Sequence, residues 1–165
     1  MKRTAAVVLL FLAGVPSISA QTRPRVELKL GAVTVWLGMP KELALKQMAE
    51  AGYRLLTPPA ADSQLWNGGT DKDPHEYPME FSSGKLTWAE VEWWTEEDPL
   101  QAVLDALSQL AEKATAPCSV VHQPLTEPGL HIDRVFIVCG SRSVRLTHSK
   151  SRKSIGVTEM IGTVK

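Results

Sequence analysis

The sequence lacks most of the features that reveal a protein's chemistry. It has two cysteines, two tyrosines and three phenylalanines, and its 18 basic and 18 acidic side chains give a formal net charge of zero. This balance of charge argues against a protein that binds nucleic acid over its whole surface. With 44% hydrophobic and 22% charged residues, the composition suits one globular domain and excludes collagen-like, low-complexity and fully disordered chains.

The motifs of common catalytic and cofactor sites are also missing. The four histidines form no H-E-x-x-H motif, and the chain has no C-x-x-C, P-loop, G-x-G-x-x-G or G-x-S-x-G motif. The segment from Glu90 to Asp98 is rich in carboxylates. We expect most of them to face solvent or to lie at a helix N-terminus, where negative charge is favourable. Asp71 and Asp73 could contribute to a calcium site but lack the other EF-hand ligands. We therefore expect no catalytic centre, no metal site and no cofactor.

The first twenty residues have the organisation of a secretory signal peptide. Two basic residues precede an uninterrupted apolar run over residues 5–15, and Pro16 is followed by small residues up to Ala20. A transmembrane helix needs about 20 apolar residues, so this run is too short to span a membrane, although an uncleaved anchor is the alternative. We expect cleavage after Ala20 and a secreted or periplasmic protein without a transmembrane anchor. The mature domain would then span residues 21–165.

Cys118 and Cys139 are the two cysteines of the chain, and export to an oxidising compartment favours a disulfide between them. The segments beside them are rich in β-branched and aromatic residues, as strands are, and Pro128 with the following glycine is typical of a turn. A hairpin that turns there places Cys118 opposite Cys139 and Val120 opposite Ile137. A reactive or metal-binding role is the alternative, but two isolated cysteines form no metal-site motif.

The residue pairs of this hairpin can be counted outward from the turn. If Glu127 and Leu130 close the turn as a hydrogen-bonded pair, the cysteines fall at a non-hydrogen-bonded pair, where side chains are closest. Pro124 then falls opposite Asp133, with its missing N–H directed away from the partner strand. These features agree with one register, which a bulge or a longer loop would shift.

Apolar residues recur with helical spacing in two parts of the chain. Pro40 suits the first turn of a helix that ends at Gly52. A second helix is expected over residues 95–114, with Asp98 as its N-cap. The apolar face of this second helix consists of Leu100, Val103, Leu104, Leu107, Leu110 and Ala111.

The remaining segments complete an α+β domain. Residues 57–78, with four prolines and two glycines, are expected to form a long irregular loop. The chain is therefore predicted to be a single α+β domain with a mostly antiparallel sheet, two helices packed on one face, and one disulfide-linked hairpin. Strands are expected over 26–37, 53–56, 79–81 and 85–94, in the disulfide hairpin, and in two segments after Cys139.

Two short motifs add a resemblance. The segment 37–42 (LGMPKE) opens the first helix, and 81–86 (FSSGKL) lies in the hairpin that follows. Over residues 33–94 this arrangement resembles small bacterial envelope domains, namely the small lipoprotein subunit of the outer-membrane β-barrel assembly machinery and the β-lactamase-inhibitor-like domains. The resemblance implies a non-enzymatic protein-binding domain and assigns no functional residue. No lipidation cysteine follows the apolar run, which departs from the lipoprotein pattern.

Two tryptophans are the candidate recognition residues. Trp66 lies in the expected long loop beside two glycines, and Trp94 lies at the end of an expected strand. Exposed tryptophan is enriched in binding sites, although core packing is the simpler role for most of the five tryptophans.

Charge is unevenly distributed along the chain. Eight acids and two lysines lie between residues 80 and 113, whereas seven bases and one acid lie between 134 and 165. Such asymmetry can mark a partner site, but the two regions can also complement each other within the fold or face solvent. The basic candidates for contact with an anionic surface are Arg142, Arg145, Arg152 and Lys153.

Together these patterns favour an exported, non-enzymatic domain that binds a protein partner in the cell envelope and binds no nucleic acid. One alternative is a small extracytoplasmic hydrolase whose site is assembled from dispersed residues. Another is a protein that binds an anionic surface through residues 142–153. Fold alone does not decide among them, because function depends on the site.

The exported protein is expected to begin at Gln21 and to carry the Cys118–Cys139 disulfide. Intact-mass analysis with and without alkylation measures both features. We expect a mass that lacks residues 1–20 and no alkylated thiol unless the protein is first reduced. Two free thiols in the native exported protein would contradict the disulfide.

Overall fold

The computed structural model describes residues 25–68, 75–93, 99–114, 116–128, 130–150 and 154–163. Within these ranges the chain forms β1 (Glu27–Leu30), β2 (Val33–Trp36), α1 (Lys41–Glu50), β3 (Arg54–Leu55), β4 (Ser63–Asn67), β5 (Glu76–Ser82), β6 (Lys85–Trp93), α2 (Pro99–Lys113), β7 (Cys118–Glu127), β8 (Leu130–Cys139), β9 (Arg142–Ser149) and β10 (Ser154–Gly162). The fold is therefore rich in sheet and carries two helices within the described residues.

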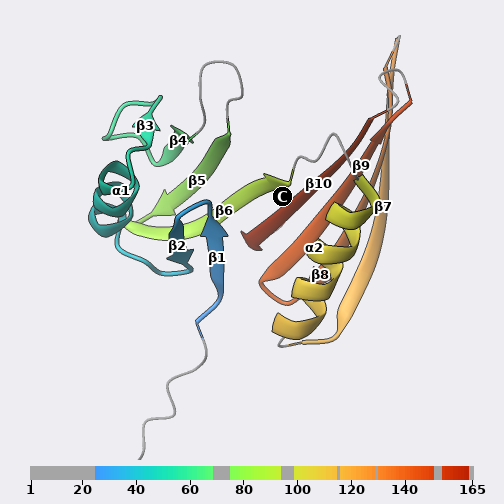
Figure 1. Ribbon diagram of the computed structural model, residues 1–165, viewed down its shortest axis with the longest axis horizontal. Coiled ribbons are helices and arrows are strands. Elements are labelled where there is room, and N and C mark those ends of the chain that lie inside the picture. The colour runs from blue at the N-terminus through green and yellow to red at the C-terminus, as the bar shows by residue number, and fades with distance from the viewer. Residues whose placement is uncertain are drawn as a thin grey trace, which may run out of the picture.

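Eight strands form one antiparallel sheet in the order β3-β4-β5-β6-β10-β9-β8-β7, and β1 and β2 form a separate hairpin. Figure 1 shows α1 beside the end of the sheet that contains β3 to β5, and α2 lying along the other end. The last strand, β10, returns to the middle of the sheet and pairs with both β6 and β9. The C-terminal segment therefore joins the two halves of the sheet.

The disulfide hairpin has the register that the sequence predicts. A disulfide joins Cys118 and Cys139, whose Cα atoms lie 4.2 Å apart. This short separation is typical of a non-hydrogen-bonded antiparallel pair. The predicted pairs are all present: Cys118 with Cys139, Val120 with Ile137, Pro124 with Asp133, and Glu127 with Leu130.

Two segments differ from the sequence prediction. Residues 26–37 do not form one strand, because a turn at Gly31, with φ of 57°, folds them into the β1–β2 hairpin. A Cβ at Gly31 would collide with the Tyr53 and Tyr77 hydroxyls, so the turn lies directly against these rings. Residues 57–78 are not an irregular loop throughout, because they contain β4 and the start of β5.

The polar composition of β4 hides its strand character in the sequence. Gln64 is buried, and its side-chain amide donates hydrogen bonds to the carbonyl oxygens of Pro58 and Ala61. A buried amide needs such partners, and the preceding turn supplies them. This strand therefore alternates inward and outward without the apolar alternation that usually predicts it.

The second helix packs against the sheet through part of the predicted face. Val103, Leu107 and Leu110 contact the sheet cluster as predicted, and two alanines outside the predicted face join them. Ala102, Ala106 and Leu110 are buried against the sheet, whereas Leu100 and Leu104 are 66% and 52% exposed. Small alanines allow the helix backbone to lie close to the strands. The predicted cap, Asp98, lies outside the described residues. Neither described helix combines the length and apolar character that crossing a membrane requires.

Two apolar clusters fill the interior, and a buried ion pair lies between them. One cluster joins α1, the β1–β2 hairpin and β4 to β6 with Ile161, and the other joins α2 to β9 and β10 with Val157. Glu159 lies between Val157 and Ile161 on the same face of β10 and forms an ion pair with Arg142. Arg142 also donates a hydrogen bond to the carbonyl oxygen of Glu27 in β1. This arginine therefore connects β9, β10 and β1.

Removing one partner of this pair is expected to destabilise the fold strongly. Arg142→Met leaves the Glu159 carboxylate buried without its counter-ion, and we expect the free energy of unfolding to fall by about 3–5 kcal/mol. The double variant Arg142→Met/Glu159→Leu removes both charges and is expected to recover most of that loss. Urea unfolding followed by circular dichroism measures both. A single variant as stable as the wild type would refute this role for the pair.

Candidate functional site

The predicted recognition residue Trp66 does not lie on the surface. It occupies β4, where it is 3% exposed and belongs to the larger apolar cluster. The expectation of an exposed ring fails because the residue belongs to a strand and not to a loop. The other predicted contacts, Trp94, Arg152 and Lys153, lie outside the described residues.

The two predicted basic contacts that the structure describes, Arg142 and Arg145, each pair with an acidic side chain within the fold. Arg142 is buried in its pair with Glu159 and so cannot meet an anionic surface. Arg145 is half-buried, with its guanidinium 3.6 Å from the Glu90 carboxylate and a hydrogen bond of 3.2 Å to the Thr158 hydroxyl. Arg145 comes from the basic region of the sequence and Glu90 from the acidic region. Their ion pair is therefore a place in the fold where the charges of the two regions compensate each other.

Burial dominates the electrostatics of Glu90. Its pKa is raised above the usual value mainly because burial disfavours the charged form, and the nearby Glu92 raises it further. The Arg145 guanidinium opposes this shift and lowers the pKa of Glu90. The carboxyl therefore has a partner but remains in an environment that favours its neutral form.

A second charged cluster joins side chains of β7 and β8 to Lys150, which follows β9. The Lys150 ammonium is 3.1 Å from the Asp133 carboxylate, and the His122 imidazole is 3.7 Å from it. The hydrogen bond from Lys150 lowers the pKa of Asp133 below its usual value. No group of three or more histidine, cysteine or acidic side chains within the described ranges is arranged to hold a metal ion.

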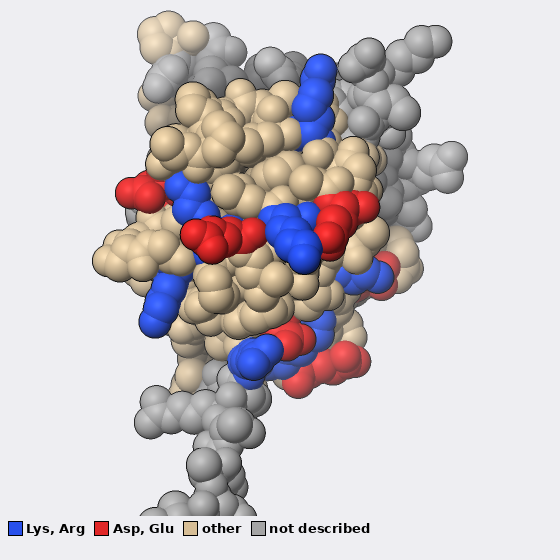
Figure 2. Space-filling model, turned by 90° about the vertical axis from the view of Figure 1, so that its left-hand side faces the viewer, with Lys and Arg blue, Asp and Glu red and all other residues tan. Residues whose placement is uncertain are grey.

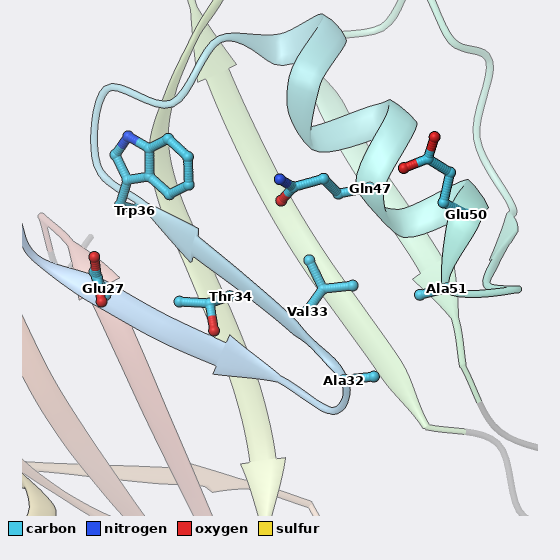
Figure 3. Close-up of a pocket in the computed structure, with 8 residues that line it drawn as sticks. All are labelled: Glu27, Ala32, Val33, Thr34, Trp36, Gln47, Glu50 and Ala51. Atoms are coloured by element: carbon cyan, nitrogen blue, oxygen red, sulfur yellow. The ribbon is translucent and has the colours of Figure 1, made fainter.

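An open groove of about 600 Å³ separates the β1–β2 hairpin from α1, and we call it the β2–α1 groove (Figure 3). Helical spacing places Gln47, Glu50 and the following Ala51 on one side of α1. In Figure 3 the Gln47 side chain extends toward β2, whereas the Glu50 carboxylate points back along the helix. The hairpin supplies the opposite wall. The lining residues are Glu27, Ala32, Val33, Thr34, Trp36, Gln47, Glu50 and Ala51.

The main chain of β2 presents unpaired groups to this groove. Leu30 and Val33 close a two-residue turn, and the Leu37 amide donates to the Val26 carbonyl oxygen at 3.0 Å. The alternation of an antiparallel ladder then directs the main-chain groups of Thr34 and Trp36 away from β1. The Trp36 carbonyl accepts a hydrogen bond from Met39 at 3.0 Å.

Three polar groups therefore remain at this edge of β2. They are the N–H and C=O of Thr34 and the N–H of Trp36, and none has a main-chain partner in the part of the chain that the structure describes. Because β2 lies between β1 and the groove, these groups face the groove rather than the sheet. Among the described residues, these three groups are the main-chain donors and acceptor that this edge leaves without a main-chain partner.

The side chains of the groove combine an aromatic surface with acidic groups. Trp36 is half-buried, and the Arg25 guanidinium lies 4.8 Å from the centre of its ring. Glu27 and Glu50 are lining carboxylates, and Glu50 makes an exposed pair of 3.7 Å with Lys46. Figure 2, which views the end of the molecule that carries α1, shows acidic and basic side chains next to each other rather than a patch of one sign.

A second hollow of about 520 Å³ lies on the other side of the β1–β2 hairpin, at the C-terminal end of α2. It shares Glu27 and Thr34 with the β2–α1 groove. Lys29 and Lys113 line it together with Arg142, whose guanidinium is already occupied by Glu159 and Glu27. The exposed face of the hairpin therefore separates two hollows.

No protein-family model matches this chain, and neither a curated protein nor a solved structure matches it. The site is therefore defined by geometry alone. Sequence reasoning missed Thr34 and Trp36 as edge residues because the pattern predicts one strand over residues 26–37, and it missed Gln47 because this polar residue of α1 belongs to no motif. The glycine at position 31 was the signal for a turn, and it would have shown that β2 has an edge of its own.

Glu90 gives the fold a defined pH dependence. Because the pKa of Glu90 is raised in the folded state, its stabilising contribution is complete below the usual value of 4.5 and is lost as the pH rises through the raised pKa. Glu90→Gln stays neutral, so we expect the variant to gain stability relative to the wild type between pH 4.5 and pH 7. Urea unfolding at both pH values measures the change. Glu76→Gln, at an exposed strand position, is the control, and equal pH trends in all three proteins would refute the assignment.

Proposed function

We propose that this chain is an exported, non-enzymatic domain that binds a protein partner in the cell envelope, and that an extended segment of the partner lies in the β2–α1 groove. The observation that carries the proposal is the unpaired main-chain edge of β2 opposite α1. An exposed edge with free donors and acceptors is a template for another strand.

The main chain would supply affinity. A segment that adds to β2 forms a third strand of the β1–β2 hairpin, with hydrogen bonds to Thr34 and Trp36. A two-stranded hairpin is marginal by itself, whereas an added strand increases both its pairing and its buried surface. The neighbouring α1 confines the segment on its other side. This arrangement of strand edge and helix would fix the direction of the bound chain.

The side chains would supply selectivity. In strand addition, alternate side chains of the bound segment point to the same side and meet the lining of the groove. Trp36 offers an aromatic surface, Gln47 offers an amide, and Glu27 with Glu50 offers negative charge. A segment with an apolar residue beside Trp36 and a basic residue near one carboxylate would complement this lining.

Several features support export. The Cys118–Cys139 disulfide is stable in oxidising compartments and rare in the cytosol. The apolar run over residues 5–15 has the length and flanking residues of a signal peptide. The resemblance of residues 33–94 to small envelope domains agrees with a binding role, and the β2–α1 groove lies within that part of the chain.

We also infer that both helices cover the same face of the eight-stranded sheet. Val144 pairs with Glu159, Val157 pairs with Trp93, and Ile161 pairs with Ala89, and residues directly opposite each other share a face. The α2 cluster contains Val144 and Val157, and the α1 cluster contains Ala89 and Ile161. This arrangement would leave the opposite face, with Glu90 and Arg145, without a helix.

Selection of peptides from a random displayed library tests the proposal, because such a library samples many extended segments and the natural partner need not be identified first. Thr34→Pro removes one donor at the groove edge without disturbing the β1–β2 ladder, since that N–H points away from β1. Gln47→Arg fills the groove from α1 with little change in helix propensity. We expect each change to weaken binding of the selected peptides by about 10-fold or more, as expected for loss of one or two hydrogen bonds.

Lys46→Arg is the matched control for the helix. It lies next to Gln47, is exposed, and does not line the groove. Its peptide affinities are expected to equal those of the wild type, measured by fluorescence anisotropy on the disulfide-bonded protein. Selected peptides that bind Thr34→Pro and Gln47→Arg as tightly as the wild type would place the binding surface elsewhere.

A further inference from the structure

The strand β7 ends the eight-stranded sheet and pairs only with β8 among the described strands. Glu127 and Leu130 close the turn, and the alternation from that pair directs the main-chain groups of every second residue of β7 away from β8. The short Cα separation at the disulfide agrees with this alternation. The outward positions are Cys118, Val120, His122, Pro124 and Thr126.

The first half of this edge lacks the usual protection of an edge strand. Proteins protect such strands with charged side chains, proline or bulges. Between Ala116 and Thr126 there is no acidic residue, lysine or arginine, and within β7 the protecting proline is Pro124. On the two faces of the unprotected half, Val120 is 69% exposed and Val121 is 50% exposed.

We propose that this half of β7 binds the same segment of a second copy of the chain, in an antiparallel register centred on Val120. This register places Cys118 opposite His122 of the second copy and Val120 opposite its own counterpart. Each of these residues has both a donor and an acceptor directed outward, so each pair can exchange both main-chain hydrogen bonds. Pro124 lies beyond the paired segment.

Other registers of the two copies satisfy fewer main-chain groups. A centre nearer the end of β7 places Pro124, which has no N–H, opposite an acceptor of the second copy. A centre nearer the start leaves outward groups without a counterpart, because the strand begins at Cys118. The position of Pro124 therefore selects the register centred on Val120.

Charge favours a second copy over a partner with a charged strand. Two identical segments meet in this register without any like-charged pair, because the paired residues 118–122 contain histidine but no acid, lysine or arginine. A two-fold interface requires such self-complementarity. The disulfide holds the start of the strand to β8, so little backbone freedom is lost on pairing.

The interface is separate from the β2–α1 groove. β7 lies at the opposite end of the sheet from β3 and β4, whereas the groove lies beside α1 (Figure 1). Pairing through β7 therefore leaves the groove of each copy open. One dimer would carry two grooves.

Sedimentation equilibrium of the mature, disulfide-bonded protein tests the proposal. Val120→Pro removes only an outward N–H, so the β7–β8 ladder remains, and we expect the dimer dissociation constant to rise by about 100-fold, because two hydrogen bonds are lost across the two-fold axis. Thr126→Pro makes the same change beyond Pro124 and is the matched control, with an unchanged dissociation constant. A monomeric wild type at all concentrations, or equal effects of the two prolines, would overturn the proposal.

A charge pair tests the two-fold axis without relying on proline. Val120→Lys and Val120→Glu each place a charge opposite the same charge of the second copy, so each variant alone is expected to be monomeric. A mixture of the two variants places opposite charges together and is expected to form heterodimers. Failure of the mixture to associate, when both variants have native circular dichroism and an intact disulfide, would exclude Val120 from the axis.

Discussion

The ion pair between Arg142 and Glu159 ties β9 to β10 at the junction of the two apolar clusters, against both of which Trp93 also packs. A charge buried this deeply requires a partner, and here the partner lies on the neighbouring strand. The same guanidinium binds the carbonyl oxygen of Glu27, a residue 115 positions earlier in the chain. The β1–β2 hairpin is thus attached to the middle of the sheet by a side chain of β9. Because this hairpin forms one wall of the β2–α1 groove, the shape of the groove depends on a pair at the centre of the fold.

The parts of the fold that sequence reasoning predicted are those set by local rules. The register of the disulfide hairpin follows from its turn and its two cysteines, and α1 follows from Pro40, apolar spacing and Gly52. The exposed face of α2 was not predictable from spacing, because alanines and leucines share one broad apolar arc. Which part of that arc contacts the sheet depends on how closely the helix can approach. Likewise, the sequence around Arg142 is typical of a surface residue, because its partners, Glu159 and Glu27, lie far from it in the chain.

The edges of β2 and β7 differ in their surroundings, and this difference suggests different roles. The edge of β2 lies in a groove that is lined by α1, two carboxylates and the Trp36 ring. Side chains as well as main-chain groups would therefore contact a bound segment. The edge of β7 has no neighbouring wall among the described residues and no charge in its first half, so its selectivity would come from the main-chain pattern and from Pro124. Both edges offer the same main-chain donors and acceptors. The surrounding side chains are what would distinguish the proposed site for a partner segment at β2 from the proposed site for a second copy at β7.

The unequal ends of the eight-stranded sheet limit how large an assembly can become. At one end β7 has ten residues, whereas at the other end β3 has two. A strand of two residues offers too few main-chain groups to hold another chain, so copies cannot be added there in succession. If two copies associate through β7, the long edge strand of each copy is paired and no longer available to a third copy. Pairing of two copies through β7, as proposed above, would therefore give a closed pair and not a fibre.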